Sequence, residues 1–131
     1  MRATRVLARA WAAPASVAGL ALAPFFARRR RRAGVLLCEG ASWPRRLGFR
    51  HRAMTLGHVV LCIDEIDEAT LAHELVHVAQ YERWGALFVP CYLGASLLAA
   101  LRGRDLYRDN PFEIAARRRA RGRLAEATSA S

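Results

Sequence analysis

The apolar positions of this chain fall into blocks whose spacing changes along the sequence. Residues 34–38 (GVLLC) form a short apolar run, and residues 53–63 (AMTLGHVVLCI) form a longer one that is apolar on both faces apart from Thr55 and His58. Short apolar runs rich in branched residues and bounded by turn residues are typical of β-strands. We therefore expect two strands, with a turn-like segment at 39–52 between them.

The pattern changes to a helical one after the second strand. The acidic residues 64–68 (DEIDE) suit the positive end of a helix dipole, and Asp64 or Asp67 can cap the first turn. Apolar residues then recur at helical spacing, at Leu71, Leu75 and Val78. Gly85 is typical of a C-terminal cap, so a largely buried helix is predicted to end there.

Residues 86–101 (ALFVPCYLGASLLAAL) carry no charge. Sixteen residues are short for a membrane-spanning helix, so this segment is either a buried core helix or a helix that touches a membrane. A polar connection at 103–109 follows. Residues 110–113 (NPFE) then predict a new helix, with asparagine as the cap, proline at the first helical position and Glu113 at the third.

These elements predict a small α+β domain at residues 34–119. It has two short β-strands, a largely buried helix that carries polar side chains, an apolar helix and a glutamate-bearing helix. Residues 1–33 are alanine-rich and basic, and we expect a disordered or peripheral arm, or else a membrane anchor. Residues 120–131 are rich in alanine, serine and threonine, and we expect a disordered tail.

The charge is unevenly distributed. The net charge is +10, and all 21 basic residues are arginine. Residues 1–52 hold twelve arginines and one acid, whereas residues 53–114 hold four arginines and nine acids. The basic ends could contact an anionic membrane surface, but the acidic middle and the lack of aromatic residues among the arginines argue against specific nucleic-acid binding.

The expected compartment follows from the cysteines and the arginine run. Cys38, Cys62 and Cys91 lie in apolar runs without C-x-x-C spacing, which indicates buried, reduced thiols. Five consecutive arginines at 28–32 directly after an apolar stretch oppose export. We expect a cytoplasmic protein, either free or at the inner face of the membrane.

The candidate chemistry lies in the first long helix, at residues 73–77 (HELVH). Two histidines four apart project from one face of a helix and can bind one metal ion together. Glu74 between them is placed to polarise a water molecule rather than to bind the metal. The motif alone is a weak signal, because H-E-x-x-H also occurs by chance.

A catalytic zinc normally has three protein ligands, so a third must come from elsewhere. The upstream candidates are His51 and His58, and the downstream ones are Asp105, Asp109 and Glu113. Glu113 is the best placed, because it opens a second helix. The N-x-x-E spacing serves equally well for a capping box in which Glu113 bonds the backbone of residue 110.

The run HELVHVAQYERWGALFVPCYLGASLLAALRGRDLYRDNPFEIAA resembles small gluzincin-type metallopeptidase-like bacterial proteins. Those proteins have H-E-x-x-H followed by V-x-Q, a hydrophobic segment and a downstream N-P-x-E-x-x-A helix that supplies a glutamate ligand. The TLGHVV segment before the motif is similar to the edge strand that lies over the active helix in such domains. The resemblance covers residues 34–119 and implies a zincin-like fold.

The resemblance also implies the site: one Zn²⁺ per chain bound by His73, His77 and Glu113, with Glu74 as the general base. The edge strand implies that an extended peptide is held near Thr55, Gly57 and His58. Tyr107 or Tyr81 is a candidate to stabilise the oxyanion. Gln80 either orients a ligand or the substrate, or is an ordinary helix-surface residue.

Three functions follow as expectations. The first is hydrolysis of peptide bonds by a zinc-bound water that Glu74 activates, in an enzyme whose partner is a peptide or protein substrate. The second is an inactive zincin-shaped binding module that recruits a partner through residues 86–101. The third is an arginine-driven binder of anionic membranes or nucleic acid.

Overall fold

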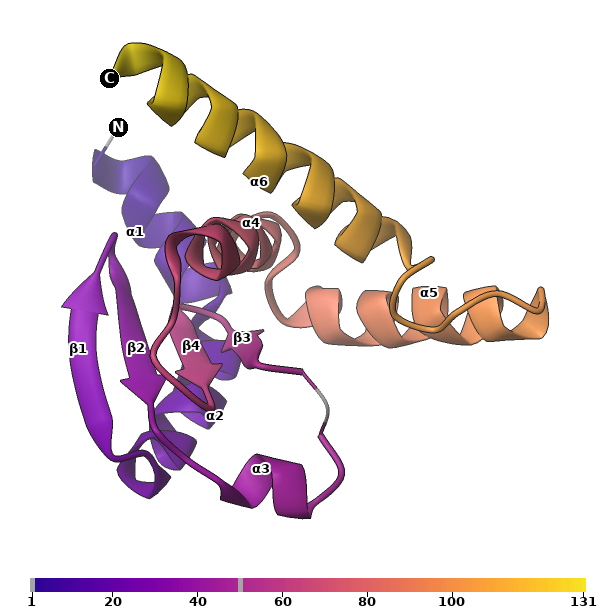
Figure 1. Cartoon of the computed structure of the whole chain (residues 1–131), viewed down its shortest axis with the longest axis horizontal. Coiled ribbons are helices and arrows are strands. Elements are labelled where there is room, and N and C mark those ends of the chain that lie inside the picture. Colours follow the sequence, from indigo (N-terminus) through magenta and orange to yellow (C-terminus); the bar gives the residue numbers. More distant parts are fainter. Residues whose placement is uncertain (1, 50) are drawn as a thin grey trace.

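A computed structural model describes residues 2–49 and 51–131 of the chain (Figure 1). Its described part is α+β, as predicted, with helices around a mixed sheet. The helices are α1 (Arg2–Trp11), α2 (Ala13–Leu22), α3 (Trp43–Arg46), α4 (Glu68–Trp84), α5 (Phe88–Leu101) and α6 (Pro111–Ala130), and 3₁₀ turns cover Ala23–Phe25 and Gly85–Leu87. The strands are β1 (Arg28–Arg32), β2 (Val35–Glu39), β3 (Ala53–Leu56) and β4 (Val59–Cys62).

The strand order in the described residues is β1-β2-β4-β3. β1 and β3 lie at the edges, and each is antiparallel to its neighbour, whereas β2 and β4 are parallel. Two packed clusters cover the sheet. In the first cluster, Val60 and Leu37 of the sheet pack with Leu71 of α4. In the second cluster, Val59 of the sheet packs with Phe26 and the end of α2. The sheet is therefore enclosed between α4 and the N-terminal helices.

The prediction of one continuous strand at 53–63 is wrong. The chain reverses at Gly57 and His58 and forms the β3–β4 hairpin, in which Leu56 pairs with Val59. Gly57 has φ +62°, and a Cβ there would lie 2.3 Å from Ser16 Oγ. Gly57 is therefore a turn residue pressed against α2 rather than a bulge within one strand.

Residues 1–33 were expected to form a disordered or peripheral arm, or else a membrane anchor, and their described part, 2–33, is built into the fold. The five arginines at 28–32 form β1, in register with β2 from Arg28 opposite Glu39 to Arg32 opposite Val35. An edge strand pairs through its backbone, so all five side chains can stay exposed. The buried carboxylate of Glu39 accepts a hydrogen bond from Arg30 at 2.7 Å, which ties β1 to the core strand.

The tail at 120–131 also differs from its prediction, because α6 continues to Ala130. The composition predicted disorder, but alanine has the highest helix propensity and favours continuation of the helix. The caps of α4 were predicted correctly. Asp67 accepts a hydrogen bond from Thr70 N at 2.7 Å, and Gly85 ends the helix with φ +61°.

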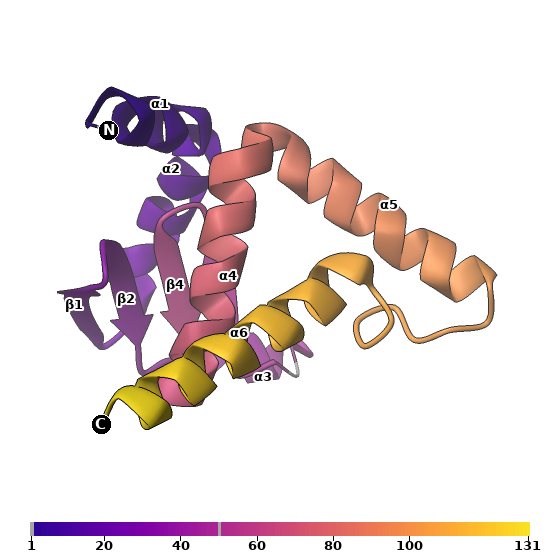
Figure 2. The same cartoon turned by 90° about the horizontal axis from the view of Figure 1, so that it is seen from above.

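The uncharged segment is a helix, but it is not a core helix. Only Phe88 and Ala99 of α5 are buried. Figures 1 and 2 show α5 extending away from the sheet. By length and composition, one described helical stretch, 68–101, is apolar enough to cross a membrane. The helices at 2–11 and 13–25 meet the same criterion only together, and because the chain bends between them they count as a second span only if the pair is taken as one.

Candidate metal centre

Three side chains from two helices meet where α4 packs against α6. His73 and His77 lie one turn apart on α4, and Glu113 lies in the first turn of α6. One potential ligand atom from each residue lies within 4.8 Å of the others. The side chains of His77 and Glu113 are almost fully buried, and that of His73 is 15% exposed.

The three atoms form a nearly regular triangle. His73 Nε2 lies 3.2 Å from His77 Nε2 and 3.0 Å from Glu113 Oε2, and His77 Nε2 lies 3.2 Å from Glu113 Oε2. A tetrahedral zinc site with bonds of about 2.0–2.1 Å has ligand atoms about 3.3 Å apart. The triangle therefore matches one face of such a tetrahedron.

Glu113 turns toward the histidines and not toward its own helix cap. The backbone N–H of Asn110, which a capping box would pair with Glu113, donates instead to Tyr107 O at 3.2 Å. Of the two predictions for Glu113, the structure thus favours a position facing the histidines. Asn110 itself is the predicted cap and accepts a hydrogen bond from Phe112 N at 2.9 Å.

Asn110 also fixes the first turn of α6 in space. It is fully buried, and its Nδ2 donates to Tyr92 O at 3.0 Å and to Ser96 Oγ at 2.8 Å, both in α5. The start of α6 is therefore anchored to α5 while its third residue reaches α4. The carboxylate of Glu113 also lies at the positive end of the α6 dipole.

Gln80 sets the tautomer of His77. Its amide Nε2 donates to Phe112 O at 3.1 Å, so its Oε1 must face His77 Nδ1, which lies 2.8 Å away. His77 therefore donates from Nδ1, and in its neutral form the lone pair of Nε2 points at the triangle. This is the arrangement a metal-binding histidine needs.

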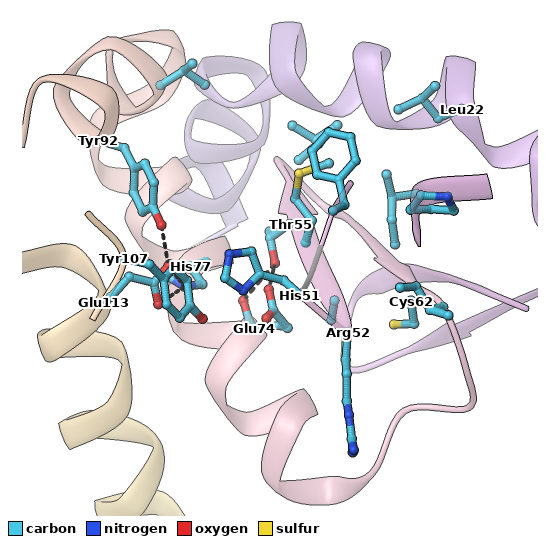
Figure 3. Close-up of a pocket in the computed structure, with 18 of the residues that line it drawn as sticks. Leu22, His51, Arg52, Thr55, Cys62, Glu74, His77, Tyr92, Tyr107 and Glu113 are labelled. Carbon is cyan, nitrogen blue, oxygen red and sulfur yellow. Dashed lines mark hydrogen bonds and ion pairs between the residues drawn. The ribbon is translucent and has the colours of Figure 1, made fainter. Parts of the chain in front are cut away.

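Tyr92 is a site residue that the sequence analysis missed. Its hydroxyl donates to Glu113 Oε1 at 2.6 Å (Figure 3), and Glu113 Oε2 lies 3.0 Å from His73 Nε2. The one available signal was a phenol in an otherwise apolar segment, and it could not show which way the ring turns.

The charges in the triangle stabilise one another. Burial acts to raise the pKa of Glu113, but hydrogen bonds from His73, His77 and Tyr92 outweigh it and hold that pKa well below its usual range. Burial acts to lower the pKa of His77, but the hydrogen bond to Glu113 and its charge raise it overall. Without a metal, a proton shared with Glu113 therefore compensates the buried carboxylate.

Glu74 lies outside the triangle but lines the same cleft as His77 and Glu113. Its buried carboxylate accepts a hydrogen bond from Thr55 Oγ1 of β3 at 2.5 Å (Figure 3). β3 is an edge strand and packs on α4, as the resemblance implied for the TLGHVV segment, but the end of that segment belongs to the inner strand β4. Thr55 thus holds Glu74 and is itself buried.

The other predicted site residues are not all near the triangle. His58 lies in the β3–β4 turn, where its Nε2 is 2.7 Å from Glu82 Oε1 and its N–H donates to Ser16 at 2.9 Å. His58 and Gly57 therefore contact the helices α2 and α4. Tyr107, in contrast, lines the cleft, with its ring 4.1 Å from that of His51.

The remaining candidates have structural partners. Asp105 caps its own loop by accepting hydrogen bonds from Tyr107 N and Arg108 N, and Asp109 accepts one from Asp105 N. Both lie outside the metal-ligand group found among the described residues. Tyr81 is buried against Phe88, with ring centroids 4.4 Å apart.

The cleft has a volume of about 680 Å³. Its polar groups include His51, Thr55, Glu74, His77 and Glu113, and most of the other walls are apolar. Comparison with protein-family models, with curated proteins and with solved structures finds no match to this chain.

Proposed function

We propose that the protein is a zinc-dependent hydrolase that acts on peptide bonds, with a zincin-like arrangement of its site. The observation that carries the proposal is the triangle of His73, His77 and Glu113, whose edges of 3.0–3.2 Å suit a single tetrahedral ion. The tautomer of His77 supports it further, because a neutral ring held by Gln80 directs its lone pair to the same point.

The chemistry of the three ligands favours zinc. Two imidazoles and one carboxylate with a free fourth position are typical of catalytic zinc rather than of structural zinc, which is usually fully ligated by protein. Magnesium and calcium prefer sites made of oxygen ligands. When bound, the zinc would supply Lewis-acid activation of a water molecule and of the substrate carbonyl.

Glu74 is the residue placed to move protons. Its carboxylate lines the cleft beside His77 and is oriented by Thr55, so it can accept a proton from the attacking water and return it to the leaving amine. Because Thr55 comes from the edge strand β3, the base and the strand that would run beside an extended peptide are positioned together.

Tyr107 is suited to donate a hydrogen bond to the developing oxyanion. Burial first, and then the nearby carboxylates of Glu113 and Glu74, raise the pKa of the Tyr107 phenol. The hydroxyl therefore stays protonated at neutral pH, as a donor must. Tyr92 already donates to Glu113 and serves to orient that carboxylate.

The test compares wild type, Glu74→Gln and His77→Ala, each with its zinc content measured, on a peptide library analysed by mass spectrometry. We expect wild type to cleave, Glu74→Gln to keep zinc but lose cleavage at least 100-fold, and His77→Ala to lose both. Glu82→Gln, on the same helix but bonded to His58, is the matched control and should cleave normally. Zinc-loaded wild type that cleaves no faster than His77→Ala would contradict the proposal and favour a non-catalytic metal-binding module.

A further inference from the structure

The outer face of α5 is apolar and uncovered. Val89, Leu93, Leu97 and Leu101 recur every four residues and so form one stripe along the helix. Their exposed fractions are 39%, 61%, 60% and 76%. Leu98 beside this stripe is 48% exposed. Monomeric soluble proteins rarely expose a contiguous apolar stripe of this kind, so it indicates a binding surface.

α5 contacts the rest of the chain through its first turn and along one side. At the first turn Phe88 packs against Tyr81 and Phe112, with ring centroids 4.4 and 5.2 Å away, and further along its length the helix accepts hydrogen bonds from the side chain of Asn110. The helix then projects from the body of the protein (Figure 2). A helix that is apolar all round is buried in a core or touches a membrane, and the described residues leave α5 outside the core.

The charge around α5 selects the occupant. Residues 84–101 carry no charge, and arginines flank them at 83, 102 and 104 with no acid from 83 to 104. A second copy of the chain would bring the same arginines, and another net charge of +10, against the first. An anionic surface with an apolar interior is complementary to both the leucines and the arginines.

We propose that α5 docks the protein on an anionic lipid bilayer. Its 14 residues span about 21 Å, which is less than the hydrocarbon thickness of about 30 Å. Most of the rest of the apolar stretch 68–101 is α4, which is packed on the sheet, so α5 lies along the interface rather than across it. Leu97 and Leu101 enter the acyl region, and Arg102 and Arg104 contact the headgroups. Val89 and Leu93 also line the cleft that holds His77 and Glu113, whereas Leu97 and Leu101 do not. Docking through Leu97 and Leu101 does not depend on hydrolysis.

The test is flotation of the full chain with vesicles of phosphatidylcholine alone or mixed with phosphatidylglycerol. We expect binding to the mixed vesicles, weaker binding to neutral ones, and weakening in high salt. Leu97→Ser/Leu101→Ser should reduce partitioning by at least about tenfold. Both side chains are exposed, so circular dichroism should show an unchanged fold.

The matched control is Val6→Ser/Leu7→Ser on α1, whose side chains are 66% and 68% exposed. Retained binding in this variant and loss in the α5 variant support the proposal, and loss in both supports it while adding α1 to the same surface. Binding that survives Leu97→Ser/Leu101→Ser overturns it. The proposal is also overturned if the wild type fails to float and instead forms a dimer. Dissociation of that dimer by Leu97→Ser/Leu101→Ser in sedimentation experiments would favour self-association.

Discussion

Gln80 holds His77 in a single tautomer, because its Oε1 lies 2.8 Å from His77 Nδ1 while its Nε2 is bonded to Phe112 O. The two residues are three apart on α4, and both are buried. Phe112 is the neighbour of Glu113, so the same amide links the histidine on α4 to the start of α6. The orientation of two of the three proposed ligands thus depends on one side chain.

Replacing Gln80 by leucine should therefore weaken zinc binding by about 10- to 100-fold, the usual effect of losing a partner that orients a ligand. The ring of His77 would lose its acceptor and could adopt the other tautomer. Competition with a chromophoric chelator measures the affinity. Gln80→Glu keeps an acceptor for Nδ1 and should recover much of it, whereas equal affinities for Gln80→Leu and wild type would mean that the hydrogen bond does not position His77.

The metal-free protein should be most stable in mildly acidic solution. The pKa of His77 is raised above its ordinary 6.5, so its contribution to stability is complete below pH 6.5 and is lost as the pH rises through the folded-state value. The pKa of Glu113 is lowered from its ordinary 4.5, so its contribution is present above pH 4.5 and is lost as the pH falls through the folded-state value. The optimum therefore lies between those two ordinary values.

Urea denaturation of chelator-treated protein at pH 5.5 and pH 8 measures this difference. We expect a lower midpoint at pH 8, and we expect added zinc to remove that loss because neutral His77 then binds the metal. His77→Gln should flatten the alkaline side of the profile. A metal-free protein that is more stable at pH 8 than at pH 5.5 would contradict the pairing of His77 with Glu113.

Gly57→Ala should destabilise the fold by about 1–3 kcal/mol. The new Cβ would lie 2.3 Å from Ser16 Oγ and 2.5 Å from Ser16 N, at a residue with φ +62°. Thermal unfolding checks the prediction. Gly48→Ala is the matched control, because Gly48 also has a positive φ but no atom lies within 4 Å of its Cβ position, and it should cost less. Equal losses would assign the whole effect to backbone strain.

Gly122→Ala should instead stabilise the protein, by about 0.5–1 kcal/mol. Gly122 lies within α6, and nothing lies within 4 Å of the position where its Cβ would be. Alanine lowers the entropy cost of forming that helix. An unchanged or lower melting temperature in the same thermal scan would indicate that the end of α6 contributes little to the folded state.

The parts of the fold that could be predicted from the sequence are those set by local signals. Asp67 and Gly85 bound α4 because capping depends on a few neighbouring residues, and the spacing of His73 and His77 alone puts them on one face. Asn110 was recognisable as a cap for the same reason. The strand β1 was not predicted from its five arginines, because composition alone does not show that an edge strand can leave all its side chains in water.

The parts of the site that could not be predicted depend on packing between helices. Glu113 had two equivalent local roles, and only the contact of α6 with α4 turns it toward His73. Tyr92 reaches Glu113 because Asn110 anchors α6 to α5, which no spacing in the sequence encodes. The turn at Gly57 was not predicted, because the apolar run continues through it.

The zinc content of the purified protein tests the central claim most directly. Elemental analysis of protein prepared without chelator and dialysed against limiting zinc should give one zinc per chain. His73→Ala, His77→Ala and Glu113→Ala should each lose it, and His51→Ala, which alters another imidazole in the cleft, should keep it. Wild type without zinc, or His77→Ala that retains a full equivalent, would contradict the assignment of this triangle as a metal centre.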